Sequence, residues 1–273
     1  MIAWNEIDFR RTPLTLSLAA IVTALEIVST FDPGRREFFF RHLELSISVD
    51  LWNGALWQPL TTTLLHGDLL HAAFNLYWLM AFGHVLERRW GSVRFGLLFL
   101  WLAYVTSTTS FLIGNASWTP GVPVHTGIGL SGVGYGLFGL LWVAGRWRPE
   151  LRAYCSRDLV VLFAGWFVLC IVLTMSGAMA IDNYAHGAGL LYGALMAAAL
   201  YASTWRRAWQ AIAATVTLAV LTLMFAAPGH PLYDAARQIH RLQRLLNRPD
   251  QAQTKPSTEA MVILSAANQN EGN

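Results

Sequence analysis

The sequence predicts an all-α membrane protein, a polytopic helical bundle with a six-helix core and a seventh C-terminal span. Two observations predict this class. The 273 residues are 55% hydrophobic and only 13% charged, whereas about a quarter of the residues in a soluble domain are charged. The apolar residues also gather in seven stretches, each near the roughly 20 residues that a helix needs to cross a bilayer. So little polar chain argues against a soluble enzyme and against a nucleic-acid-binding protein.

The seven stretches give the element order. In chain order they are Leu14–Phe31, Leu69–Leu86, Phe95–Gly114, Leu130–Trp147, Leu159–Ser176, Tyr184–Thr204 and Ala208–Ala227. The first has span length and no small-residue cleavage site follows it, so we expect a span rather than a signal peptide. The seventh is rich in Ala and Thr and carries no polar motif. We therefore expect a core over 14–204, a short N-terminus over 1–13 and an extra transmembrane helix over 208–227.

Two longer segments lie outside these spans. The connection 32–68 holds Phe38, Trp52 and Trp57 among charged residues, which favours a segment lying partly in the bilayer interface. A small loop with ordinary interfacial aromatic residues is the alternative. The polar tail 228–273 contains Leu232–Leu246, whose apolar residues fall on one face of a helix and predict an amphipathic helix. Whether 208–227 crosses the membrane, and hence the side of this tail, is left open by the sequence.

The placement of arginine orients the spans. The 19 basic residues are 18 Arg and one Lys. Eleven of the arginines lie before span one or in alternate connections, and three lie in the other connections. The eleven are Arg10, Arg11, Arg88, Arg89, Arg94, Arg146, Arg148, Arg152, Arg157, Arg206 and Arg207, and the three are Arg35, Arg36 and Arg41. Because short cytoplasmic loops are rich in Arg and Lys, we expect a cytoplasmic N-terminus. We further expect a multi-pass protein of the bacterial inner membrane. Spans two, four and six then begin at the external face.

Polar side chains inside spans are costly and often functional. In span two, His71 and Asn75 are four residues apart and share one helix face. In span four, Ser131 lies in the first helical turn, where unpaired N–H groups and the positive end of the helix dipole converge. Each motif also has a purely structural interpretation. The His/Asn pair could form interhelical hydrogen bonds, and Ser131 could be an N-cap serine in a glycine packing seam.

The third polar cluster opens span six. His186 lies near the start of the predicted helix, with Gly189 and Gly193 on the same face. These glycines allow a neighbouring helix to approach closely, and a packing histidine is the structural alternative. Taken together, the three clusters lie at one depth on one side of the membrane.

A serine beside a neutral imidazole is the minimal unit of nucleophile and base. The His/Asn pair and a helix N-terminus opposite it are suited to donate hydrogen bonds to an oxyanion. Asp182 is the one acidic residue near His186 and lies just outside the span, which favours a Ser–His dyad over a triad.

From Trp57 to Ala199 the sequence resembles the rhomboid family of intramembrane serine proteases. The motifs that carry the resemblance occur in order: His66-x4-His71-x3-Asn75, Gly129-Leu-Ser131-Gly132, and Ala185-His186-x2-Gly189-x3-Gly193. A charged connection, Glu87-Arg88-Arg89-Trp90-Gly91, adds to them. The family usually has Trp-Arg in its long first connection, and this chain reads Trp57-Gln58. Each string is weak alone, and the ordered set is specific.

The resemblance implies roles for these residues. Ser131 would be the nucleophile and His186 the general base and then acid, while His71, Asn75 and the Ser131 N–H would be the oxyanion donors. The supporting residues would be Tyr135 against the imidazole, together with Gly129, Gly132, Gly189, Gly193 and His66. The loop Gly177–Asn183 would cap the site, and span five would be a lateral gate.

The resemblance also implies the reaction and its partners. Family members bind a transmembrane substrate helix from the side and cleave it near the external membrane surface, so the partners would be substrate helices and the lipid bilayer. We expect no cofactor, no metal and no nucleic acid. Other classes of intramembrane protease fit poorly, since neither His-Glu-x-x-His nor Gly-x-Gly-Asp occurs.

Three other functions compete with intramembrane endopeptidase activity. A rhomboid-like sorting enzyme would trim C-terminal membrane anchors and transfer the acyl group to an acceptor other than water. A catalytically inactive relative would bind membrane clients, although such scaffolds generally lack the serine or the histidine, and both are present here. A metal transporter that uses His66, His71, His125 and His186 is a weaker rival. His125 lies in a loop, and no acidic residue lies in the even-numbered spans to offset the charge of a cation.

Overall fold

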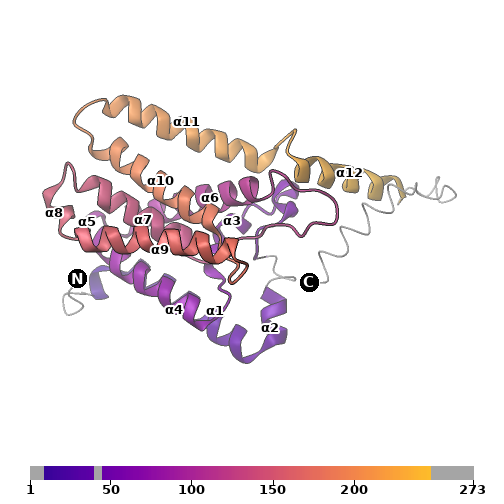
Figure 1. Cartoon of the computed structure of the whole chain (residues 1–273), viewed down its shortest axis with the longest axis horizontal. Coiled ribbons are helices and arrows are strands. Elements are labelled where there is room, and N and C mark those ends of the chain that lie inside the picture. Colours follow the sequence, from indigo (N-terminus) through magenta and orange to yellow (C-terminus); the bar gives the residue numbers. More distant parts are fainter. Residues whose placement is uncertain (1–8, 40–44, 247–273) are drawn as a thin grey trace.

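The computed structural model describes residues 9–39 and 45–246, and every regular element in these ranges is helical. The all-α prediction is therefore confirmed for the described chain. Arg41, one of the three arginines in the other connections, lies outside these ranges, as does the tail beyond Leu246. Long helices run side by side as a bundle, with α7 and α10 inside it and α11 along one edge (Figure 1).

The long helices follow the predicted apolar stretches. They are α1 (Pro13–Phe31), α4 (Leu69–Trp78) with α5 (His84–Trp90), α6 (Ser92–Gly114), α7 (Ser131–Ala144), α9 (Arg157–Met175), α10 (Asn183–Tyr201) and α11 (Arg206–Phe225). A π-helical turn, Leu79–Gly83, joins α4 to α5. Five of the helices, counting 69–90 as one, are long and apolar enough to cross a membrane. The helix α7 ends at Ala144, three residues before the predicted end, because a turn follows at Gly145.

The outer helices present apolar side chains to their surroundings. On α9 the exposed residues include Val161, Leu162, Val168, Leu169, Val172 and Met175. An exposed apolar surface of this kind is unfavourable in water and favourable in lipid. The interior of the bundle, in contrast, is closed by Phe82, Phe95, Leu102, Leu137 and Leu140, each fully buried.

A buried carboxylate ties α1 to the hairpin between α5 and α6. Glu87 accepts hydrogen bonds from the backbone N–H groups of Leu14 and Thr15 at 2.8 and 2.7 Å. The hydroxyls of Thr15 and Ser92 each donate to the same carboxylate at 2.6 Å. Four donors therefore offset the cost of burying the charge, and the start of α1 is fixed against the rest of the bundle.

The long connection between α1 and α4 contains short helices. They are α2 (Pro33–Glu37), the 3-10 helices η4 (Val49–Asn53) and η5 (Thr62–Leu64), and α3 (Gln58–Thr61). Of its predicted interfacial aromatics, Trp57 is 47% exposed, whereas Trp52 is 8% exposed and packs on Phe111 of α6. The indole N–H of Trp52 donates to the carbonyl of Leu223 at 3.0 Å, so η4 is attached to the end of α11.

The C-terminal segment belongs to the same bundle. The helix α11 packs along α10 and α6, and α12 (Pro231–Leu246) follows it after a short turn. His230 contacts the carbonyl of Leu112 at 2.8 Å, and the ring of Tyr233 meets Trp52 edge to face. The helices α11 and α12 fall within the predicted segments 208–227 and 228–273 apart from the first two residues of α11, and both pack against η4 in the connection between α1 and α4.

Candidate active site

Ser131 is the first residue of α7, and a glycine-containing loop leads into it. Gly129 has φ +107°, a conformation that favours glycine, and its N–H donates to the carbonyl of Thr62 at 3.1 Å. The hydroxyl of Thr62 donates in turn to the carbonyl of Gly127 at 2.6 Å. The loop is therefore attached to the η5 region on both sides of Ile128, which sets the position at which α7 begins.

His71 and Asn75 lie against this loop. A methyl group at Gly129 would come within 2.9 Å of the His71 ring and 3.3 Å of Asn75 Nδ2. The helix that carries them is capped by Asp68, whose carboxylate accepts from the His71 N–H at 2.9 Å. The predicted pair thus shares a face of α4, as its spacing indicates, and this face meets the segment before Ser131.

Hydrogen bonding favours donors on both side chains. The Gly67 N–H points at His71 Nδ1 over 3.4 Å, so in a neutral imidazole the proton is on Nε2. Asn75 is 5% exposed, and its Nδ2 has no hydrogen-bond partner among the described residues. A buried amide with unused donors is costly unless another group accepts them. This pair can therefore hold a developing negative charge beside the loop.

His186 lies in the first turn of α10 and is 4% exposed. Its ring stacks on Tyr135, with centroids 4.7 Å apart and an interplanar angle of 27°. The hydroxyl of Tyr135 donates to the carbonyl of Phe163 at 3.3 Å, and this hydrogen bond fixes the Tyr135 ring against which His186 stacks. No hydrogen-bond partner for Nδ1 of His186 is present in the described chain.

Glycines bring α7 and α10 into backbone contact. A methyl group at Gly132 would lie 3.2 Å from the Cβ of Ala185, the residue before His186. A methyl at Gly189 would overlap the carbonyl oxygen of Gly132, and one at Gly193 would overlap that of Gly136. The chain neighbours of Ser131 and His186 therefore touch. The N-terminal ends of the two helices meet at one level, as the glycine pattern predicts.

His66 also supports the loop before Ser131, and its ring lies edge to face against that of His71. It is 1% exposed, and its Nε2 accepts from the Leu130 N–H at 3.3 Å. Burial, followed by the nearby imidazole of His71, lowers the pKa of His66 from 6.5 to about 3. The ring therefore stays neutral and keeps an acceptor for the backbone immediately before Ser131.

A small cavity lies between these elements. Its volume is about 10 Å³, close to the space needed for a single water molecule. Ser131 lines it together with Gly129, Gly132, Thr106, Ser107 and Asp182. In the loop predicted to cap the site, Met179 is 54% exposed.

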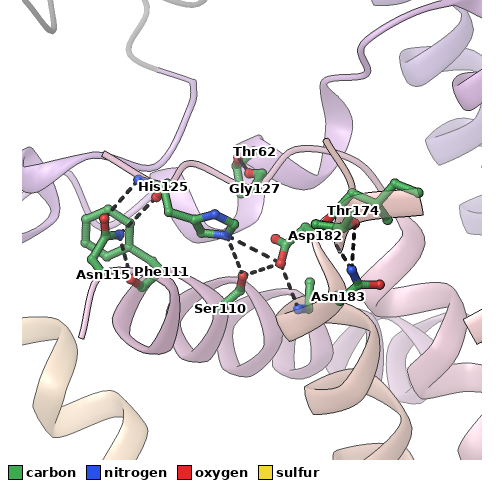
Figure 2. Close-up of polar contacts among 11 residues, drawn as sticks. Thr62, Ser110, Phe111, Asn115, His125, Gly127, Thr174, Asp182 and Asn183 are labelled. Atoms are coloured by element: carbon green, nitrogen blue, oxygen red, sulfur yellow. Dashed lines mark hydrogen bonds and ion pairs between the residues drawn. The ribbon is translucent and has the colours of Figure 1, made fainter. Parts of the chain in front are cut away.

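Sequence reasoning missed the polar contacts that hold the loop 115–130. Figure 2 shows Ser110, His125 and Asp182 meeting at one point, with Thr62 and Gly127 beside them. Thr62 and Gly127 are 65 positions apart, so no spacing could have linked them. The sequence offered one signal for these contacts: an aspartate directly before a predicted helix is a typical N-cap. Asp182 does cap α10, because its carboxylate accepts from the Ala185 N–H at 2.9 Å.

These features define a class of protein. The chain is an integral membrane helical bundle that holds a serine, a histidine and a His/Asn pair at the adjoining ends of three helices. Clusters of three or more His, Cys, Asp or Glu side chains suited to a metal do not occur among the residues that the structure describes. The arrangement is suited to hydroxyl-based acyl transfer.

Comparison with known proteins places the chain within that class. The family model for the rhomboid domain matches residues 53–203, just over half of the chain. The chain belongs to the rhomboid family. It is 35% identical over 142 residues to the rhomboid protease GlpG of Serratia proteamaculans (strain 568), covering 52% of this chain and 47% of that protein. It is also 35% identical over 147 residues to the rhomboid protease GlpG of Enterobacter sp. (strain 638), with coverages of 52% and 48%.

The match covers only part of each protein. The chain spans about half the length of the curated relatives it matches. The matched region includes Ser131, His186, His71 and Asn75, while α11 and α12 lie beyond it.

Proposed function

We propose that this protein is an intramembrane serine endopeptidase, a hydrolase that cleaves transmembrane segments of membrane proteins. The observation that carries the proposal is the contact of Gly132 with Ala185, which brings the helix ends bearing Ser131 and His186 together. The family and the name of its curated relatives support the same reaction.

In the proposed reaction Ser131 Oγ attacks the carbonyl carbon of the scissile peptide bond while His186 takes the hydroxyl proton. The tetrahedral intermediate expels the amine, to which His186 returns the proton, and an acyl-enzyme remains. Water, deprotonated by His186, then attacks the ester, releasing the carboxylate product and restoring the serine. The absence of a carboxylate partner for His186 Nδ1 in the described chain supports a dyad.

The oxyanion would be held by His71, Asn75 and the Ser131 N–H. The last of these is one of the unpaired donors at a helix start, where the helix dipole adds to the stabilisation. The unused Nδ2 of Asn75 and the Nε2 proton of His71 both lie beside the Gly129 backbone. These donors are fixed before substrate binds, which is the condition for strong transition-state stabilisation.

We further propose that the substrate is a transmembrane helix entering from the bilayer beside α9. The exposed apolar face of α9 supports this route. The arginine distribution supports a cytoplasmic N-terminus and a site that opens to the external side. The helix α11 is also long and apolar enough to cross. If it crosses, α12 would lie on the external side.

The test uses a fluorophosphonate probe and a transmembrane reporter substrate in detergent or liposomes. Ser131→Ala should abolish both labelling and cleavage, and His186→Ala should do the same. Ser17→Ala, another serine substitution within a span, is the matched control, because Ser17 donates to the Pro13 carbonyl on α1. Residual labelling in Ser131→Ala would refute the nucleophile. Mass spectrometry of the products distinguishes hydrolysis from transfer to another acceptor.

A further inference from the structure

One carboxylate joins three separate parts of the chain next to the proposed active site. Asp182 Oδ1 accepts from Ser110 Oγ of α6 at 2.6 Å and from the Ala185 N–H of α10 at 2.9 Å. His125 Nε2, from the loop 115–130, lies 3.5 Å from the same oxygen (Figure 2). All three contacts converge on Oδ1, and Asp182 also lines the cavity that Ser131 lines.

The loop partner is itself rigidly held. The His125 N–H donates to Asn115 Oδ1 at 2.9 Å, and Asn115 Nδ2 donates to the His125 carbonyl at 3.0 Å. Two positions further on, Gly127 leaves no room for a methyl group beside Asp182 Oδ2. Movement of Asp182 would therefore displace the backbone that leads through Gly129 to Ser131.

The helix partner carries the proposed base. Asp182 is the N-cap of α10, and its carbonyl accepts from the His186 N–H at 3.2 Å. The carboxylate thus sets where α10 starts and, one turn later, where His186 lies. Ser110 is 1% exposed and adds a fixed point on α6.

We infer that Asp182 is a positioning residue, which through Ser110 and His125 holds the Ser131 loop and the His186 helix in the alignment needed for catalysis. This inference rests on the proposed function. Among the described residues the carboxylate bonds to Ser110 and to the Ala185 N–H and lies beside His125, so its positioning effect acts through the two elements that it joins.

Ionisation of Asp182 is compatible with this role. Burial opposes the charged form, but contacts with His125 and Ser110 and the Ala185 N–H outweigh it and hold the pKa below its usual value. The carboxylate therefore remains an acceptor for all three partners at neutral pH. Loss of the carboxylate would remove the acceptor of the buried Ser110 hydroxyl and of the Ala185 N–H. Removing one partner of a buried hydrogen bond is the costly way to break it.

The test compares Asp182→Ala with Asp182→Asn. The asparagine amide oxygen can replace Oδ1 and keep the three partners, and asparagine is an equally good N-cap. We expect Asp182→Ala to lower kcat and the fluorophosphonate labelling rate about 10- to 100-fold, the scale of a small misalignment, with KM little changed. Asp182→Asn should recover most of both rates. Ser156→Ala, which removes the N-cap of α9, is the control for cap loss and should leave both rates near wild type.

His125→Ala provides a second variant, since it leaves the α10 cap and the backbone contacts with Asn115 intact. It removes only the ring that lies against Asp182 and Ser110. It should lower kcat in the same way, including in the case that Asp182→Ala fails to fold. The inference is overturned if Asp182→Ala and His125→Ala both label and cleave at wild-type rates. It is also overturned if Asp182→Asn is as slow as Asp182→Ala. Ser131→Ala run in parallel separates the two proposals, because cleavage by that variant would refute the function itself.

Discussion

The contact between α7 and α10 predicts the effect of adding one methyl group. In Gly189→Ala the new Cβ would overlap the Gly132 carbonyl oxygen, with the Gly132 carbonyl carbon at 3.0 Å and the Gly136 nitrogen at 3.2 Å. All three are backbone atoms, so no side-chain rotation relieves the overlap. The helices must separate by more than about 1 Å to restore normal van der Waals distances.

That separation has two measurable consequences. Overpacking typically costs about 1–3 kcal/mol, so the free energy of unfolding should fall by that amount. The same movement displaces His186 from Ser131, and a misplacement of about 1 Å can cost 10²-fold in rate. Thermal melting in detergent measures the first effect, and the rate of fluorophosphonate labelling measures the second.

Gly165→Ala is the matched control for stability. A methyl group at this position of α9 meets nothing within 4 Å, and Ala is favoured over Gly in a helix by about 0.5–1 kcal/mol. It should leave the melting temperature unchanged or raise it. The reasoning is refuted if Gly189→Ala melts and labels like the wild type, because the two helices would then not be in backbone contact.

Three further outcomes follow from the structure. Asn75→Ala should lower kcat about 10²- to 10³-fold, the usual cost of one oxyanion donor, with normal melting; a wild-type kcat would contradict its role. Trp52→Ala should lower the free energy of unfolding, measured by chemical denaturation, by about 3–5 kcal/mol. Trp205 is 77% exposed, so Trp205→Ala should have little effect. Equal effects of the two substitutions would contradict the attachment of η4 to α11. Because the pKa of His66 is lowered to about 3, its contribution to stability is complete above pH 6.5 and is lost as pH falls toward 3. Melting measured from pH 7 to pH 4 should therefore drop less steeply in His66→Gln, and identical slopes would contradict the shift.

Periodicity and composition predicted most of the fold. Apolar length located α1, α4 with α5, α6, α9 and α11 because membrane spans need a nearly continuous run of apolar residues. The glycines at 189 and 193 predicted the close packing of α10, since their spacing matches one helix face. The π-turn at Leu79–Gly83 was not predictable, because it leaves the apolar pattern unchanged.

The part of the site that local spacing encodes could also be predicted. His71 and Asn75 fall on one face because they are four residues apart, and Ser131 opens a helix after a glycine-rich loop. The contacts among Thr62, Gly127 and Asp182 join segments far apart in sequence, so they depend on tertiary packing. The burial of Trp52 was missed for the same reason: its partners come from α6, α11 and α12.

The central claim is that Ser131 is a nucleophile activated at the meeting point of three helices. Its most direct test is mass spectrometry of the wild-type protein after reaction with a fluorophosphonate. The adduct should lie on Ser131 alone, in a peptide that contains Gly132 and Tyr135, and should not form in His186→Ala. An adduct on another residue would contradict the account. So would the absence of any adduct on a protein that still cleaves the reporter substrate.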